Sequence, residues 1–132
     1  MLAGTNDWRL KNTIGDVGSN TGVPNTDPGT MCGAMGAILT YIYTHNPYVK
    51  IYICPSPQIR MLQNNVSEAM SYINASYNMA AYWGLPMLDI WHSGISGVVG
   101  GNYTEMLYDL THPNYFGAKM LGETLINGLH GV

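Results

Sequence analysis

An aspartate and a histidine near the C-terminal end of the chain have the spacing of an acid–base pair. Asp109 and His112 are three residues apart, and Pro113 follows directly. At this spacing the carboxylate can accept a hydrogen bond from the imidazole Nδ1–H, which fixes the tautomer and leaves Nε2 free as a general base. The motif is short, and a surface aspartate beside a helix-capping histidine would give the same pattern.

The segments that must position this pair alternate between helical and strand-like patterns. Apolar residues at helical spacing predict a helix that begins at Gly29 or Thr30 and ends near residue 44, and a second helix over residues 65–83. A last helix is expected from Pro113 or Asn114 to about residue 129. Short apolar runs predict strands over residues 1–4, 49–54 and 87–90. This alternation predicts an α/β domain whose parallel strands are joined by right-handed crossovers.

Polar residues follow each predicted strand. Asn6 follows the first strand, Ser56 the second and His92 the third, while His112 precedes the last predicted helix. Functional groups in open parallel sheets gather beyond the carboxyl ends of the strands. We therefore expect the chemistry of this chain to lie along one rim.

The composition excludes some classes of function. The net charge is −3, and the five basic residues form no stripe, which argues against a nucleic-acid-binding protein. Charged residues make up only 10% of the chain, and such an uncharged polar surface favours an extracellular, phage-borne or cell-surface location over a cytoplasmic one. No apolar run is long enough for a membrane span. Cys32 and Cys54 are expected to be free thiols, and the scattered histidines indicate no metal site.

Two blocks of the chain resemble the SGNH/GDSL-type ester hydrolases. Gly4-Thr5-Asn6-Asp7 is similar to the family's third block, and Asp109-Leu110-Thr111-His112-Pro113, with Gly117 after it, is similar to the fifth. The order of helices and strands between the blocks also follows the family, so the resemblance covers nearly all of residues 1–132. It implies one partial domain with a three-layer α/β/α, flavodoxin-like parallel sheet, N-terminally truncated to about three strands, and no cofactor.

The resemblance also implies roles for individual residues. His112 would be the general base and then the acid for the leaving alcohol, and Asp109 would orient it. Asn6 would donate its side-chain amide to the oxyanion of the tetrahedral intermediate. Gly4 would allow a tight backbone turn, and Asp7 would organise that turn. The implied substrates are esters, commonly acyl groups on carbohydrates, lipids or small alcohols.

The chain departs from the family at its beginning. The family's Gly-Asp-Ser block and its second, glycine-bearing block would precede Gly4, and only three residues do so. No internal serine is a convincing substitute, because Ser56 lies between two prolines and Ser93 and Ser96 lie in a glycine-rich loop. We therefore expect this chain to lack the nucleophile and to be inactive alone.

The missing first strand would leave residues 1–4 as an exposed apolar edge. Such edges pair readily with other chains. We therefore expect a homo-oligomer, or a complementing N-terminal segment that binds this edge. An alternative function is a non-catalytic module that retains the fold and either self-associates or binds glycans.

Overall fold

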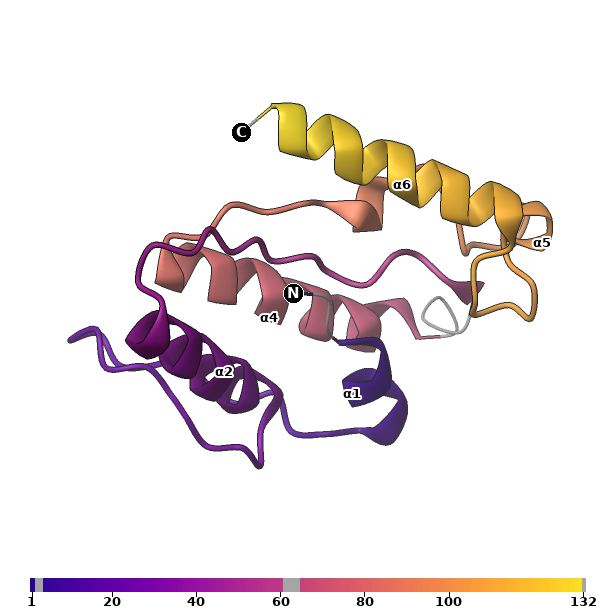
Figure 1. The fold of residues 1–132 in the computed structure, drawn as a ribbon. Coiled ribbons are helices and arrows are strands. Elements are labelled where there is room, and N and C mark those ends of the chain that lie inside the picture. Colours follow the sequence, from indigo (N-terminus) through magenta and orange to yellow (C-terminus); the bar gives the residue numbers. More distant parts are fainter. Residues whose placement is uncertain (2–3, 61–64, 132) are drawn as a thin grey trace.

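The structure, a computed structural model, describes residues 1, 4–60 and 65–131. Its helices are α1 (Thr5–Leu10), α2 (Met31–His45), α4 (Val66–Trp83), the 3-10 helix η1 (Ile90–His92), α5 (Tyr103–Met106) and α6 (Tyr115–His130). Figure 1 shows α6 on one side of two central extended segments and α1, α2 and α4 on the other. None of the helices in this described part is long and apolar enough to cross a membrane.

The three helices predicted from apolar periodicity are confirmed as α2, α4 and α6. Each begins at the expected polar residue. The Thr30 hydroxyl accepts a hydrogen bond from the Gly33 N–H at 3.1 Å, and the Asn65 side chain accepts one from the Glu68 N–H at 3.2 Å. Asn114 caps α6 in the same way. These side-chain oxygens satisfy amides that have no partner inside the helix.

The predicted three-layer α/β/α, flavodoxin-like sheet is wrong. The segments 49–54 and 87–90 are extended and lie side by side, but they meet at one isolated parallel bridge, between Ile53 and Met87. The Ile53 N–H donates to the Pro86 carbonyl at 3.0 Å, and the Leu88 N–H donates to the Ile53 carbonyl at 2.8 Å. Within residues 4–60 and 65–131 no β-sheet forms, and the molecule is mostly helical.

Proline and an early turn explain why this pairing stops. Pro55, Pro57 and Pro86 flank the bridge and have no N–H to donate to a ladder. Beyond the bridge the second segment turns into η1 at Ile90. The apolar run that predicted each strand is real, but its burial comes from the helices on either side and not from a sheet.

The first predicted strand, residues 1–4, falls partly outside the described residues. The terminal ammonium of Met1 donates to the Tyr52 carbonyl at 2.6 Å, and the Cys54 N–H donates to the Met1 carbonyl at 2.7 Å. The chain then turns at Gly4, which has a φ of 111°, and enters α1. The block that contains Asn6 is therefore the start of a helix and not a loop.

One hydrophobic core joins α2, α4 and the extended segment. Leu39, Ile53 and Met79 are fully buried within it. In contrast, the only buried residue of α6 is Gly117. The core therefore lies mainly on the side of the extended segments that α2 and α4 cover.

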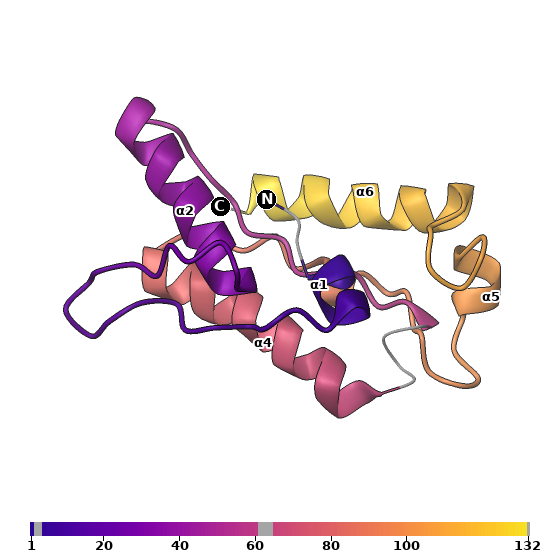
Figure 2. The ribbon, with the colours of Figure 1, turned by 90° about the horizontal axis from the view of Figure 1, so that it is seen from below.

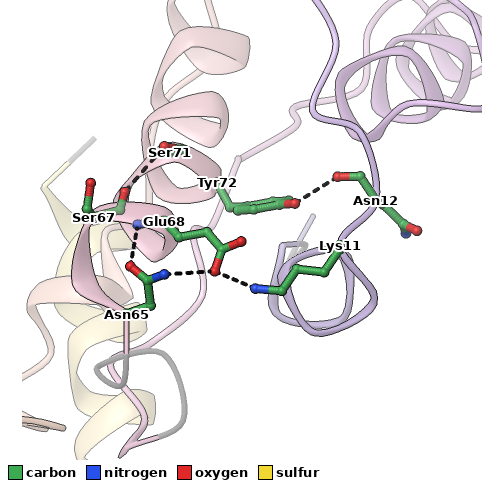
Figure 3. A network of polar contacts seen from close by, with 7 residues as sticks. All are labelled: Lys11, Asn12, Asn65, Ser67, Glu68, Ser71 and Tyr72. Atoms are coloured by element: carbon green, nitrogen blue, oxygen red, sulfur yellow. Dashed lines mark hydrogen bonds and ion pairs between the residues drawn. The ribbon is translucent and has the colours of Figure 1, made fainter.

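Polar contacts fix the end of α1 and the following loop to α4. Lys11 forms an ion pair with Glu68, and the Asn65 side-chain amide donates to the same carboxylate at 3.3 Å (Figure 3). The Tyr72 hydroxyl donates to the Asn12 carbonyl at 2.8 Å. Figure 2 shows the loop of residues 12–30 continuing from this anchor beside α4 and α2. These contacts hold α1, and with it Asn6, in place.

Two glycines allow α2 to lie very close to this loop. A Cβ atom on Gly36 would lie 2.0 Å from the Asn25 carbonyl oxygen, and one on Gly33 would lie 2.1 Å from the Asp27 carbonyl oxygen. Since the obstructing atoms belong to the backbone, Gly36→Ala should lower the free energy of unfolding by about 1–3 kcal/mol. Urea denaturation measures this change. Gly122→Ala in α6, where a Cβ meets nothing within 4 Å, is the control, and an equal loss in both variants would contradict the close contact.

Candidate functional site

A pocket of about 650 Å³ lies between α1, the chain after the bridge and the start of α6. It contains the three side chains to which the sequence assigned chemistry, Asn6, Asp109 and His112. The described residues that line it are Thr5, Asn6, Arg9, Pro57, Ile59, Ile90, Asp109, Thr111, His112, Pro113 and Leu121. Folding thus brings together residues from opposite ends of the chain.

Asp109 and His112 form the expected hydrogen-bonded pair. The imidazole Nδ1 lies 2.8 Å from Oδ2 of Asp109 and 3.0 Å from Oδ1. The His112 side chain is 75% exposed, so Nε2 is accessible to a ligand. This geometry suits the Nδ1–H tautomer, in which Nε2 can accept a proton.

A closed loop presents the pair to the pocket. The Tyr108 N–H donates to the His112 carbonyl at 2.7 Å, and Leu107 and Pro113 form an antiparallel bridge at the base of the loop. Leu110, with a φ of 67°, takes the left-handed conformation that reverses the chain. The loop therefore fixes the spacing of Asp109 and His112 through backbone contacts.

Hydrogen bonds hold the Asp109 carboxylate in its charged form. The backbone N–H of His112 donates to Oδ1 at 2.8 Å, the imidazole donates from Nδ1, and the N–H of Thr111 donates at 3.2 Å. These donors lower the pKa of Asp109 below its ordinary value. The backbone N–H of His112 has the largest effect, and the imidazole has the next largest.

This lowered pKa predicts how the loop responds to acid. A carboxyl group whose pKa is lower in the folded state stabilises that state fully above its unfolded value, here 3.8, and loses this contribution as the pH falls through the folded value. The backbone amide signals of Thr111 and His112 should therefore shift in acid with a midpoint below pH 3.8, as NMR can measure. Asp109→Asn should abolish the transition, and a midpoint above that pH would contradict the hydrogen-bonding account.

Asn6 lies in the first turn of α1 and is exposed. Among the described residues its side-chain amide has no hydrogen-bond partner, so it is free to donate to a ligand in the pocket. Gly4 and Asp7, which the resemblance placed in support, do not line the pocket. Asp7 accepts a hydrogen bond from the Asn12 side chain at 3.1 Å, which closes the end of α1.

No serine or cysteine is among the described residues that line the pocket. Ser56 is buried, its hydroxyl lies 2.5 Å from that of Thr5, and it donates to the Pro57 carbonyl at 3.1 Å. Cys32 and Cys54 are free thiols, and burial is the main cause that raises the pKa of each. A raised pKa disfavours the reactive thiolate.

Sequence reasoning missed a second Asp–His pair with the same spacing. The imidazole Nδ1 of His92 lies 2.7 Å from Oδ2 of Asp89, and the His92 side chain is 68% exposed. The position of His92 after a predicted strand favours a partly buried structural histidine, and this prediction is wrong. Burial, together with the Asp89 carboxylate, raises the pKa of the nearby Tyr77 to about 12. Neither Asp89 nor His92 lines the pocket, so this pair serves as an internal control for the first.

Sequence reasoning also gave no reason to place Arg9 beside Asn6. The two residues share a face of α1 only because this segment is helical, whereas the sequence predicted a strand end followed by a turn. In the part of the chain that the structure describes, no cluster of three or more histidine, cysteine or acidic side chains could hold a metal ion.

Comparisons with known proteins show the fold alone. No protein-family model matches the chain, and no curated protein matches it. A crystal structure of a Lactobacillus plantarum protein, a structural-genomics target, is similar with a TM-score of 0.82 and 22% identity over 98% of this chain and 64% of its own. Another crystal structure is similar with a TM-score of 0.79 and 20% identity over 99% of this chain and 63% of its own. The chain therefore spans a little under two thirds of the length of these solved structures.

Proposed function

We propose that the chain is the part of a serine ester hydrolase that supplies the general base and one oxyanion donor. The observation that carries the proposal is the shared pocket, in which the free Asn6 amide and the Asp109–His112 pair line one cavity. Both block resemblances to the SGNH/GDSL-type hydrolases support it. The proposal depends on these side chains and not on the sheet that was predicted.

The proposed reaction needs a serine from outside this chain. His112 Nε2 accepts the proton of that serine hydroxyl as its oxygen attacks the ester carbonyl. The Asn6 amide donates to the negative oxygen that forms, and Asp109 stabilises the imidazolium. When the carbon–oxygen bond to the alcohol breaks, His112 returns the proton to the alcohol. Water then attacks the acyl-enzyme by the same route and releases the acid.

Fluorophosphonate labelling tests the proposal. The experiment compares the 132-residue chain with a longer polypeptide that includes the residues encoded upstream of Met1. We expect a Gly-Asp-Ser segment in the longer polypeptide and covalent labelling there, whereas the 132-residue chain stays unlabelled. The label should be lost in His112→Ala and retained in the matched variant His92→Ala.

Two results would contradict the proposal. One is labelling of the 132-residue chain itself, since the described residues that line its pocket include no serine or cysteine. The other is labelling of the longer polypeptide that His112→Ala leaves unchanged. A stop codon directly upstream of Met1 would favour a non-catalytic function.

Self-association is the second candidate function. α6 is poorly covered, and it leaves Phe116, Ile126 and Leu129 exposed at 63%, 56% and 47%. Ile126 and Leu129 are three residues apart and share a face of α6, and contiguous exposed apolar surface marks interaction sites. We expect a dimer or larger assembly by light scattering during size-exclusion chromatography at micromolar concentration. A clean monomer would contradict this candidate.

A further inference from the structure

The pocket contains one cation with no partner among the described residues. Arg9 lines the pocket, is exposed, and forms no ion pair or hydrogen bond with the described part of the chain. Asp109 is the only carboxylate among the described lining residues, and its oxygens already accept hydrogen bonds from Thr111 and His112. The guanidinium charge is therefore available to a ligand.

The helix places the Arg9 side chain on the same face as that of Asn6, the proposed oxyanion donor. Asn6 and Arg9 are three residues apart in α1, so their Cβ atoms lie on one face at about 5–6 Å. The lining also includes the apolar side chains of Ile59, Ile90 and Leu121. A ligand that fits has an ester carbonyl near Asn6, an anionic group within reach of Arg9 and an apolar portion.

We infer that the substrates are esters that carry a carboxylate or similar anion close to the scissile carbonyl, with Arg9 as the residue that selects them. This inference rests on the proposed ester hydrolase function. A guanidinium binds a carboxylate through two parallel hydrogen bonds, which makes it selective for that shape as well as for charge. A neutral ester of the same size leaves Arg9 unpaired and gains nothing from it.

NMR titration of the 132-residue chain tests the inference through binding alone. Monomethyl glutarate carries one ester and one carboxylate, and dimethyl glutarate is its neutral match. We expect monomethyl glutarate to bind about ten-fold more tightly, to shift the signals of Asn6 and Arg9, and to weaken as salt is added. Arg9→Gln should remove this advantage, whereas Lys119→Gln, which changes an exposed cation of α6 outside the pocket, should preserve it.

The outcomes separate this inference from the proposed function. Equal binding of the two esters, or a preference that survives Arg9→Gln, overturns the selection by Arg9. Because both results are read from binding, they leave the role of His112 to the labelling experiment. Conversely, ester binding could depend on Arg9 while fluorophosphonate labelling is unchanged in His112→Ala. That combination would support an anion-binding site at Arg9 and contradict the proposed hydrolase function.

Discussion

His112→Ala is expected to lower ester turnover on the order of a million-fold in the nucleophile-bearing form of the protein, close to complete loss. The reason is that the serine hydroxyl has no other base in the pocket. Asp109 cannot substitute, because its carboxylate points to the imidazole and is held charged by backbone N–H groups. The turnover number for p-nitrophenyl acetate, measured at saturating substrate, gives the effect.

His92→Ala is the matched control for this variant. His92 has the same spacing from an aspartate and a similar exposure, but it lies outside the pocket. We expect its turnover number to equal that of the unchanged protein. Equal losses of turnover in the two variants would show that neither imidazole acts as a specific base. Unchanged turnover in His112→Ala would show that His112 is not the general base.

Ile53→Ala should produce the largest loss of stability, about 2–5 kcal/mol in the free energy of unfolding. Ile53 is fully buried and lies at the only parallel bridge of the described structure. Since one bridge cannot hold an extended segment in place, side-chain packing must do so, and alanine would leave a cavity there. The expected loss is a large part of the total stability of a domain this size.

Urea denaturation measures this loss, and Ile38→Ala is its control. Ile38 is 49% exposed on α2, and its truncation should change the free energy of unfolding by no more than about 0.5 kcal/mol. Similar losses in both variants would show that the core does not centre on the extended segment.

The helices could be predicted because local sequence determines where they begin. Thr30, Asn65 and Asn114 each precede an apolar periodic segment, and each caps its helix in the structure. Their side chains act over three residues, so the signal is contained in a short window. Apolar spacing then identifies the buried face of α2 and α4.

The sheet could not be predicted reliably because strand pairing depends on distant residues. A short apolar run is compatible with a strand or with an extended segment packed between helices. Ile53 follows the second pattern, since the prolines beside it prevent further pairing. The family resemblance reinforced the wrong choice by implying a parallel sheet.

The site was predictable only in part. The Asp109–His112 contact is local, and the spacing of the two residues permits it, although that spacing alone is a weak signal. The approach of Asn6 to this pair depends on α1, whereas the sequence predicted a strand end followed by a turn there. The position of Arg9 on the face of Asn6 follows from the helical geometry of α1, so the predicted turn gave no indication of it. The second pair, Asp89 and His92, has the same spacing, and the sequence assigned this pair no role.

The tautomer of His112 tests the central claim most directly, because it can be read in the 132-residue chain without a nucleophile. Long-range proton–nitrogen correlation NMR, at a pH where the ring is neutral, reports which ring nitrogen carries the proton. We expect the Nδ1–H form, donating to Asp109, with Nε2 unprotonated in the pocket, and loss of this preference in Asp109→Asn. A predominant Nε2–H form in the unchanged chain would contradict the account, since that nitrogen could not accept the serine proton.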